Sequence, residues 1–254
     1  MKVAAIQHDI VWEDGPATRA RLEPLIAQAA AGGAGLIVLS EMYATGFSMQ
    51  QDQVAEQPGG PNERFLVEQA QRHGAWLVGS IAQWNGPAGD PLAANVAVLA
   101  GPSGQLLRYD KIHPFGYAGE HEHYRAGKDF LTVDVGGLRV SVFICYDLRF
   151  ADEFWALAAD TDLYLVLANW PQGRYEHWRT LLRARAIENQ AYVLGCNRVG
   201  EADRLSYRGD SAIIDPMGRT LIEASHVEAV LAAEVDPAQV LEVRARFPFL
   251  ADRR

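Results

Sequence analysis

The order of strand-like and helix-like segments constrains the fold of this chain most, because the same order occurs twice. The first half alternates apolar runs with helical patterns and continues as a meander, with strands expected at 2–8, 36–39, 76–84, 93–100 and 105–109 and helices at 16–31 and 61–73. The second half repeats this order, with strands expected at 130–135, 138–145, 163–168, 192–196, 211–215, 220–223 and 229–235 and helices at 150–159 and 175–189. Each half therefore predicts a mixed sheet with helices on one face. Two such sheets can bury their free faces against each other, so we predict an α/β fold, a four-layer αββα sandwich, as one domain over residues 1–254.

Charge and composition argue against several classes of function. The net charge of −9 argues against a nucleic-acid partner, because phosphate binding needs basic patches. No apolar run approaches the roughly 18 to 20 residues that span a bilayer, and the chain reaches His8 and Asp9 too soon for a signal peptide. The two cysteines, Cys145 and Cys196, suit free thiols in a reducing compartment. The sequence thus predicts a cytoplasmic protein with no nucleic-acid or membrane partner.

One apolar run, 140–144, ends abruptly at Cys145 and continues into Asp147 and Arg149. The charged residues cannot continue a buried strand, so the backbone is expected to turn sharply there. A cysteine at such a turn stands at the rim of the sheet, where the following backbone N–H groups can point at whatever the sulfur attacks. A lone cysteine is more often a small buried hydrophobe, and we interpret Cys196 in that way.

Two further reactive groups also follow apolar strands. Glu41 comes after the strand 36–39, and Lys111 follows the strand 105–109. Each residue, taken singly, could lie in solvent or in a surface ion pair. If the three strand ends share one rim, an acid, an amine and a thiol converge.

These three groups suit hydrolysis of an amide or a nitrile. A thiolate can attack the carbon to form a thioester, provided that a base or a cation activates the thiol. Glu41 could be the base, and Lys111 could stabilise the oxyanion together with the backbone N–H of Tyr146. Such a reaction requires no cofactor and no metal.

The segment 144–150, Ile-Cys-Tyr-Asp-Leu-Arg-Phe, resembles the nucleophile segment of the nitrilase (carbon-nitrogen hydrolase) superfamily. The resemblance covers nearly the whole chain, and it implies the αββα sandwich, catalytic roles for Glu41, Lys111 and Cys145, and assembly at least as a homodimer. It also implies a second glutamate that positions the substrate and the lysine, and Glu120 matches that position better than Glu122. Ser40 departs from the proline that the family usually has before the first glutamate.

The segments 120–127, 168–171 and 184–192 look like the bacterial omega-amidase branch of the superfamily. This resemblance implies a small-molecule substrate, 2-oxoglutaramate or succinamate, whose terminal amide is hydrolysed with release of ammonia. A free carboxylate on the substrate needs a cation or several N–H donors in the pocket, and the sequence does not indicate which groups supply them. Expected pocket walls are aromatic side chains, each of which could equally pack in a loop: Tyr43, Phe47, Phe115, Tyr117 and Trp170.

The sequence also allows other interpretations. Another superfamily activity, on deaminated glutathione, an N-carbamoyl amino acid or an aliphatic amide, is one alternative, and a non-catalytic scaffold is another. A metal site built from His113, His121 and His123 is a less favoured hypothesis. Asp147 and Arg149 are expected in structural ion pairs behind the nucleophile, although Arg149 could instead hold the helix ends near the site, and Arg183 and Arg185 are expected at an interface. The tail, 236–254, is expected to pack on a neighbour, in this chain or at an oligomer interface.

Overall fold

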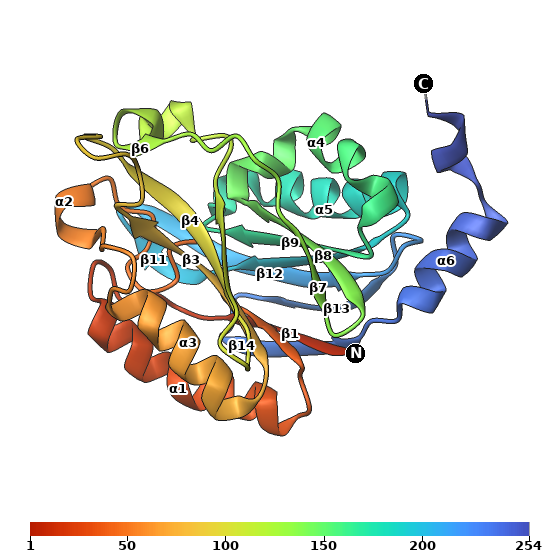
Figure 1. The fold of residues 1–254 in the computed structure, drawn as a ribbon, viewed down its shortest axis with the longest axis horizontal. Helices are drawn as coiled ribbons and strands as arrows, with labels where there is room; N and C mark the ends of the chain where they lie inside the picture. Colours follow the sequence, from red (N-terminus) through yellow and green to blue (C-terminus); the bar gives the residue numbers. More distant parts are fainter. Residues whose placement is uncertain (254) are drawn as a thin grey trace.

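The computed structural model describes residues 1–253 and contains two seven-stranded sheets (Figure 1). The strands of the first sheet are β1 (Lys2–Gln7), β2 (Leu36–Val38), β3 (Trp76–Gln83), β4 (Ala93–Ala100), β5 (Leu106–Asp110), β6 (Tyr124–Arg125) and β14 (Ala229–Glu234). Those of the second are β7 (Thr132–Val135), β8 (Leu138–Ile144), β9 (Leu163–Ala168), β10 (Tyr192–Asn197), β11 (Val199–Ala202), β12 (Leu205–Ile214) and β13 (Thr220–Ser225). The first sheet has the order β14-β1-β2-β3-β4-β5 and the second β11-β12-β10-β9-β8-β7, with β6 beside β4 and β13 beside β12.

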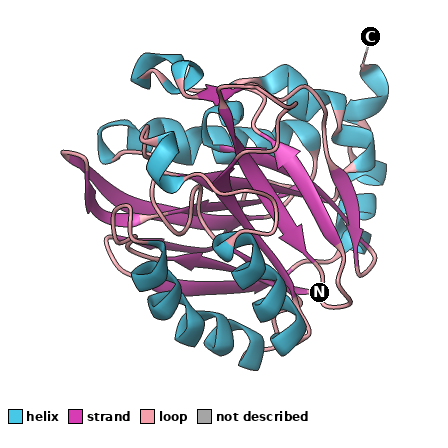
Figure 2. Ribbon diagram, turned by 60° about the vertical axis from the view of Figure 1, so that its left-hand side comes forward, coloured by secondary structure: helices cyan, strands magenta, loops and turns pink. Residues whose placement is uncertain are grey.

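Helices cover the outer face of each sheet, which confirms the predicted αββα sandwich (Figures 1 and 2). The first sheet carries α1 (Gly15–Ala31) and α3 (Pro61–His73), and the second carries α4 (Ala151–Ala156) and α5 (Tyr175–Asn189). The remaining helices are α2 (Gln51–Val54) and α6 (Pro237–Arg246), and the 3-10 turns are η1 (Gly116–Ala118), η2 (Glu120–Glu122), η3 (Cys145–Arg149), η4 (Ala158–Asp160), η5 (Gln172–Arg174) and η6 (Phe249–Asp252). None of the helices in residues 1–253 has the length and apolar character needed to cross a membrane.

Alternation of side chains along the central strands builds the layers. In β1, Val3 and Ala5 belong to the apolar cluster shared with the second sheet, whereas Ala4 and Ile6 belong to the cluster shared with α1 and α3. Successive residues of a strand point to opposite faces, so a strand buried on both faces is apolar throughout. This explains why the strands appear in the sequence as continuous apolar runs.

The strand expected at 229–235 forms as β14, but it does not close the second sheet as the sequence order suggested. It crosses to the first sheet and pairs antiparallel to β1, with Lys2 opposite Glu234 and Gln7 opposite Ala229. The crossing satisfies the backbone groups of β1, which would otherwise form an open edge. The two halves of the chain are therefore tied together by their first and last strands.

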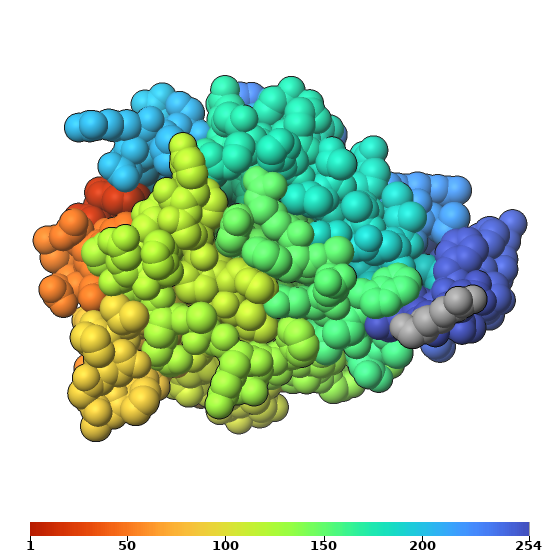
Figure 3. Space-filling model, turned by 90° about the horizontal axis from the view of Figure 1, so that it is seen from above, coloured from red at the N-terminus to blue at the C-terminus, as the bar shows by residue number. Residues whose placement is uncertain are grey.

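A hairpin that the sequence did not indicate forms from β11 and the start of β12. Asp203 and Arg204 form its two-residue turn with φ values of 45° and 63°, the geometry of a tight hairpin turn. The hairpin, light blue in Figure 3, projects beyond the body of the molecule beside the amino-terminal segment, in agreement with the bridge between Asp9 and Val199. It forms one rim of the pocket described below.

Candidate active site

Cys145 lies where β8 ends and η3 begins, with a φ of 47° that is unusual for a residue other than glycine. Left-handed backbone of this kind costs about 1–3 kcal/mol and persists where the surroundings enforce it. Asp147 does so here, because its Oδ2 accepts the N–H of Ile144 (2.9 Å) and the hydroxyl of Tyr109 (2.8 Å), and its Oδ1 accepts the N–H of His113 (2.9 Å). The sharp turn expected after the strand is therefore present.

Within residues 1–253, Asp147 forms no ion pair with an arginine, contrary to the expectation from the sequence, because its two oxygens already accept hydrogen bonds from these three donors. It is buried, and burial raises its pKa to about 7. Arg185, expected at an interface, is also buried: it donates to the carbonyl of Leu148 (2.7 Å) and to Glu188 (2.8 Å), and so holds α5 against η3.

Glu41, Lys111 and Glu120 form one buried ionic cluster. Lys111 Nζ donates to Glu41 Oε1 (2.9 Å) and to both oxygens of Glu120 (3.1 and 2.8 Å), and all three side chains are nearly inaccessible to solvent. Burial alone would lower the pKa of Lys111, but the charges of Glu120 and Glu41 outweigh it and raise that pKa. Burial raises the pKa of Glu120, against the opposing charge of Lys111. The amine is therefore held as an ammonium between two carboxyl groups.

The Cys145 thiol is the fourth member of the cluster. Burial and the nearby charge of Glu41 raise its pKa well above the ordinary value, whereas the charge of Lys111 acts in the opposite direction. The resting sulfur is therefore protonated, with Glu41 as the neighbouring group able to accept the proton. The structure brings together the four residues that the sequence singled out from distant positions.

Asn95, in the middle of β4, supports the cluster and was missed from the sequence. Its Nδ2 donates to Glu41 Oε1 (2.9 Å) and to Glu120 Oε1 (3.2 Å), while its Oδ1 accepts the hydroxyl of Ser80 (2.8 Å). Ser80 Oγ in turn accepts the N–H of Met42 (2.7 Å), which fixes the turn after Glu41. The available signal was a single amide side chain within the otherwise apolar run 93–100.

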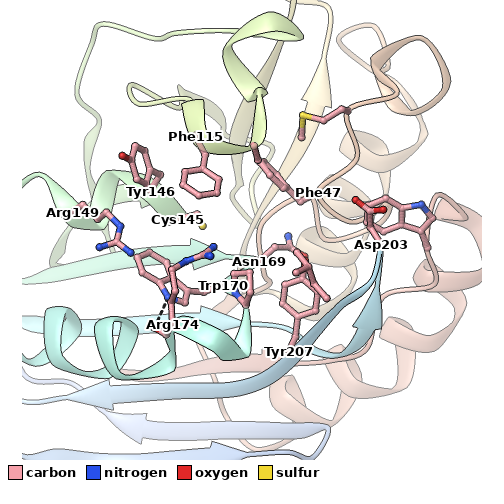
Figure 4. A pocket seen from close by; sticks show the side chains of 15 residues that line it. Phe47, Phe115, Cys145, Tyr146, Arg149, Asn169, Trp170, Arg174, Asp203 and Tyr207 are labelled. Carbon is pink, nitrogen blue, oxygen red and sulfur yellow. Dashed lines mark hydrogen bonds between the residues drawn. The ribbon is translucent and has the colours of Figure 1, made fainter.

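Above the cluster lies a pocket between the two sheets' rims (Figure 4). Its lining residues are Trp12, Phe47, Met49, Phe115, Ala118, Cys145, Tyr146, Arg149, Asn169, Trp170, Pro171, Arg174, Asp203, Leu205 and Tyr207. The pocket lining thus includes Phe47, Phe115, Tyr146 and Trp170, which the sequence singled out. Tyr117 does not line the pocket and is 90% exposed.

Tyr43 also lies outside the pocket, so its expected position was wrong. Its ring is buried against Phe65, at 6.2 Å between centroids, and its hydroxyl donates to the carbonyl of Asn62 (2.7 Å). The reason is the positive φ of Met42 (40°), which turns the chain after Glu41 toward α3. Tyr43 therefore packs in the helix layer.

Two arginines in the pocket were not identified as substrate contacts from the sequence. Arg149 lies over the ring of Trp170 (4.8 Å) and donates to His177 Nδ1 (3.1 Å), and Arg174 lies over the ring of Phe115 (5.4 Å). Within residues 1–253, neither guanidinium group forms an ion pair with a carboxylate. Figure 4 shows both on the side of the pocket occupied by Tyr146, away from Asp203. The pocket therefore offers an anion two charged donors.

The three histidines of the metal hypothesis are not brought together. In the described chain, the one group of possible ligands within 4.8 Å of one another is His113, Asp147 and Glu153. His113 Nε2 is 2.5 Å from Glu153 Oε1, and the Asp147 oxygens serve the turn after Cys145. His121 and His123 lie elsewhere, so the hypothesis as stated is wrong.

Comparisons with family models, known sequences and solved structures all indicate the same protein family. The carbon-nitrogen hydrolase family matches residues 2–245. The chain is 41% identical to omega-amidase YafV of Yersinia enterocolitica over 99% of this chain and 96% of that one, and 32% identical to 2-oxoglutaramate amidase of Bacillus subtilis over 99% and 97%. Its structure is similar to that of a CN-hydrolase superfamily protein from Xanthomonas campestris with an arsenic adduct in the active site, with a TM-score of 0.94, 36% identity and coverage of 100% and 97%. The chain therefore belongs to the carbon-nitrogen hydrolase family, the nitrilase superfamily, and is a hydrolase of carbon-nitrogen bonds.

Proposed function

We propose that this protein is an omega-amidase, which hydrolyses the terminal amide of a small substrate with a carboxylate at its other end, such as 2-oxoglutaramate or succinamate. The observation that carries this proposal is the pocket itself. The Cys145 thiol lines the pocket, the Glu41 carboxylate and the Lys111 ammonium are buried beside that thiol, and two arginines without carboxylate partners among residues 1–253 lie in the pocket wall. The relatives named omega-amidase and 2-oxoglutaramate amidase support the same substrate class.

In the first half of the reaction, Glu41 takes the proton of the Cys145 thiol as the sulfur attacks the amide carbon. The resulting oxyanion is stabilised by the Lys111 ammonium and by the backbone N–H of Tyr146. Glu41 then gives its proton to the amide nitrogen, the carbon-nitrogen bond breaks, and ammonia leaves a thioester on Cys145. Because the thiol has a raised pKa, proton removal is coupled to attack.

In the second half, a water molecule attacks the thioester. Glu41 takes one proton from that water, the same oxyanion site is used again, and the carbon-sulfur bond breaks as the sulfur regains a proton. Glu120 does not exchange protons in this scheme. It positions the Lys111 ammonium through two short contacts, 3.1 and 2.8 Å.

Arg149 and Arg174 are the groups that we propose for the substrate carboxylate. A hydrogen bond between an arginine and a carboxylate is charge-assisted and contributes about 1.5–3 kcal/mol. The aromatic rings of Trp170 and Phe115 pack against the guanidinium groups of Arg149 and Arg174, respectively, and do not neutralise their charge. A neutral amide would gain nothing from these two charges.

The test is turnover of five substrates: ammonia release is followed for 2-oxoglutaramate, succinamate, an N-carbamoyl amino acid and butyramide, and release of the peptide amine is followed for deaminated glutathione. The proposal expects turnover of the first two to exceed that of butyramide, and complete loss of turnover in Cys145→Ala. Faster turnover of deaminated glutathione, an N-carbamoyl amino acid or butyramide would replace the omega-amidase assignment by another activity of the superfamily. Absence of any turnover would favour the scaffold alternative.

Assembly and location complete the proposal. The tail packs partly on its own chain, through Gln190 Nε2 to the carbonyl of Phe247 (2.7 Å) and Arg244 to that of Thr161 (2.7 Å). Leu241 and Phe249 nevertheless remain 62% and 57% exposed, which supports a homodimer or larger homo-oligomer. Both cysteines are free, and the nucleophile must stay reduced, so we place the protein in the cytoplasm.

A further inference from the structure

We propose that Asn169 Oδ1 accepts a hydrogen bond from the amino group of the scissile amide, and that this contact selects primary amides over esters and N-substituted amides. The inference rests on the proposed cysteine amidase chemistry, but it does not depend on the substrate's carboxylate. Asn169 follows the end of β9 and is 4% exposed, and it lines the pocket together with Cys145 (Figure 4).

Two contacts fix Asn169 against the catalytic acid. Its backbone N–H donates to Glu41 Oε2 (2.8 Å), and its side-chain Nδ2 donates to the carbonyl oxygen of Glu41 (2.5 Å). A carbonyl oxygen accepts hydrogen bonds and cannot donate them, so the side-chain atom facing it must be the nitrogen. The orientation of the amide is thereby determined, and the opposite atom is Oδ1.

Asn169 Oδ1 is buried and has no hydrogen-bond partner among residues 1–253. Eleven other buried side-chain atoms in this part of the chain also have no hydrogen-bond partner, but none of those belongs to a residue that lines the pocket. A buried acceptor without a donor is unfavourable, and native structures rarely contain one without a reason. A ligand that brings an N–H group to this position removes the deficit.

The polarity of the floor matches a primary amide. Lys111 Nζ and the N–H of Tyr146 are donors and suit the amide oxygen, whereas Asn169 Oδ1 and Glu41 are acceptors and suit the amide N–H groups. The nitrogen must approach Glu41 in any case, since that residue gives it the proton with which ammonia leaves. Asn169 Oδ1, on the residue whose N–H holds Glu41 Oε2, is therefore placed on the leaving-group side.

The Asn169 Oδ1 acceptor also discriminates against esters and against the acid product. An ester oxygen carries no hydrogen at the position of the amide nitrogen. The carboxylate formed by hydrolysis would place a second oxygen against the lone pairs of Asn169 Oδ1. A site built to bond a donor rejects the analogue that lacks it, because its own polar group is then left unpaired. The same contact thus favours amide binding and disfavours retention of the acid.

The test uses the Cys145→Ala protein, which holds ligands without converting them. Calorimetry measures the Kd of succinamate, of its methyl ester analogue monomethyl succinate, and of N,N-dimethylsuccinamate. We expect the primary amide to bind about ten-fold more tightly than either analogue, as one buried hydrogen bond allows. The double variant Cys145→Ala/Asn169→Ala should reduce this preference to less than about two-fold.

Asn95→Ala in the same background is the matched control. Asn95 also donates to Glu41 but does not line the pocket, so its loss should weaken all three ligands and leave the preference intact. Equal affinities in the Cys145→Ala protein, or a preference that survives Asn169→Ala, would overturn the inference. If the Asn169 variant does not fold, equal affinities of succinamate and its dimethyl analogue in the Cys145→Ala protein would still overturn the inference. Butyramide, methyl butyrate and N,N-dimethylbutyramide repeat the test without a carboxylate. A preference seen with these ligands alone would therefore contradict the omega-amidase assignment while supporting the role of Asn169.

Discussion

Replacement of Lys111 by methionine tests whether the buried ionic cluster is held together by its single cation. The ammonium lies 2.8–3.1 Å from oxygens of Glu41 and Glu120, and all three side chains are nearly inaccessible to solvent. Without it, two carboxylates share a buried site with no compensating charge. Breaking a buried pair in this way costs about 3–5 kcal/mol.

In a chain of this size a loss of 1 kcal/mol lowers Tm by about 2–4 °C, so Lys111→Met should melt about 6–20 °C below the wild type at pH 8. The deficit should also depend on pH. Burial already raises the pKa of Glu120 in the folded protein, and removing the opposing charge of Lys111 raises it further above the value in the unfolded chain. A carboxyl group whose pKa is higher in the folded protein stabilises the fold while it is protonated, and that stability is lost as the pH rises through the folded pKa. The Tm deficit of Lys111→Met should therefore be smaller at pH 5 than at pH 8.

The assay is thermal unfolding followed by circular dichroism between pH 5 and pH 8, with Arg21→Met as the matched control. Arg21 pairs with Glu228 on the surface, with both side chains more than 40% exposed, so its loss should cost less than about 1 kcal/mol at every pH. A deficit of Lys111→Met that stays below 1 kcal/mol, or that grows as the pH falls, would refute this description of the cluster.

Three further predictions concern the pocket and the thiols. Arg174→Gln should lower kcat/KM for 2-oxoglutaramate about 10-fold to 100-fold, chiefly through KM, and change butyramide turnover less than three-fold; equal losses for both substrates would exclude a role in carboxylate binding. Cys196→Ser should retain turnover within a few-fold, because Cys196 Sγ is buried and donates to the carbonyls of Ile6 and Val38 (3.4 Å each), and a loss as severe as that of Cys145→Ala would contradict this assignment. Prolonged dialysis against EDTA should leave ammonia release unchanged, since each proposed step uses side chains and water; inactivation that is reversed by a divalent metal would contradict the scheme.

Local features of the sequence were sufficient to predict the strand ends that carry the reactive groups. Glu41, Lys111 and Cys145 each interrupt or follow an apolar run, so their position at a sheet rim follows from burial alone. The doubled order of strands and helices likewise predicts the layers. Resemblance to a known family was needed for Glu120, which lies in an irregular loop without a periodic pattern.

Long-range features were not predictable in this way. The pairing of β14 with β1 joins the two ends of the chain, and nothing in the residues 229–234 distinguishes one sheet edge from another. The burial of Tyr43 depends on the positive φ of Met42. The role of Asn95 depends on the tertiary packing that brings Glu41 and Glu120 within hydrogen-bonding distance of its side chain. The expected ion pair of Arg149 does not form among residues 1–253, because tertiary packing instead places its guanidinium group over Trp170 and beside His177 in the pocket wall.

Acid quenching followed by mass spectrometry can trap the thioester that we propose on Cys145. The protein is mixed with 2-oxoglutaramate, quenched within the first turnovers, digested and analysed at the peptides that contain Cys145 and Cys196. We expect an adduct with the mass of the substrate minus ammonia on the Cys145 peptide, and no adduct on the Cys196 peptide or in Cys145→Ala. Steady turnover with no adduct on Cys145, or turnover that persists in Cys145→Ala, would contradict the proposed thioester.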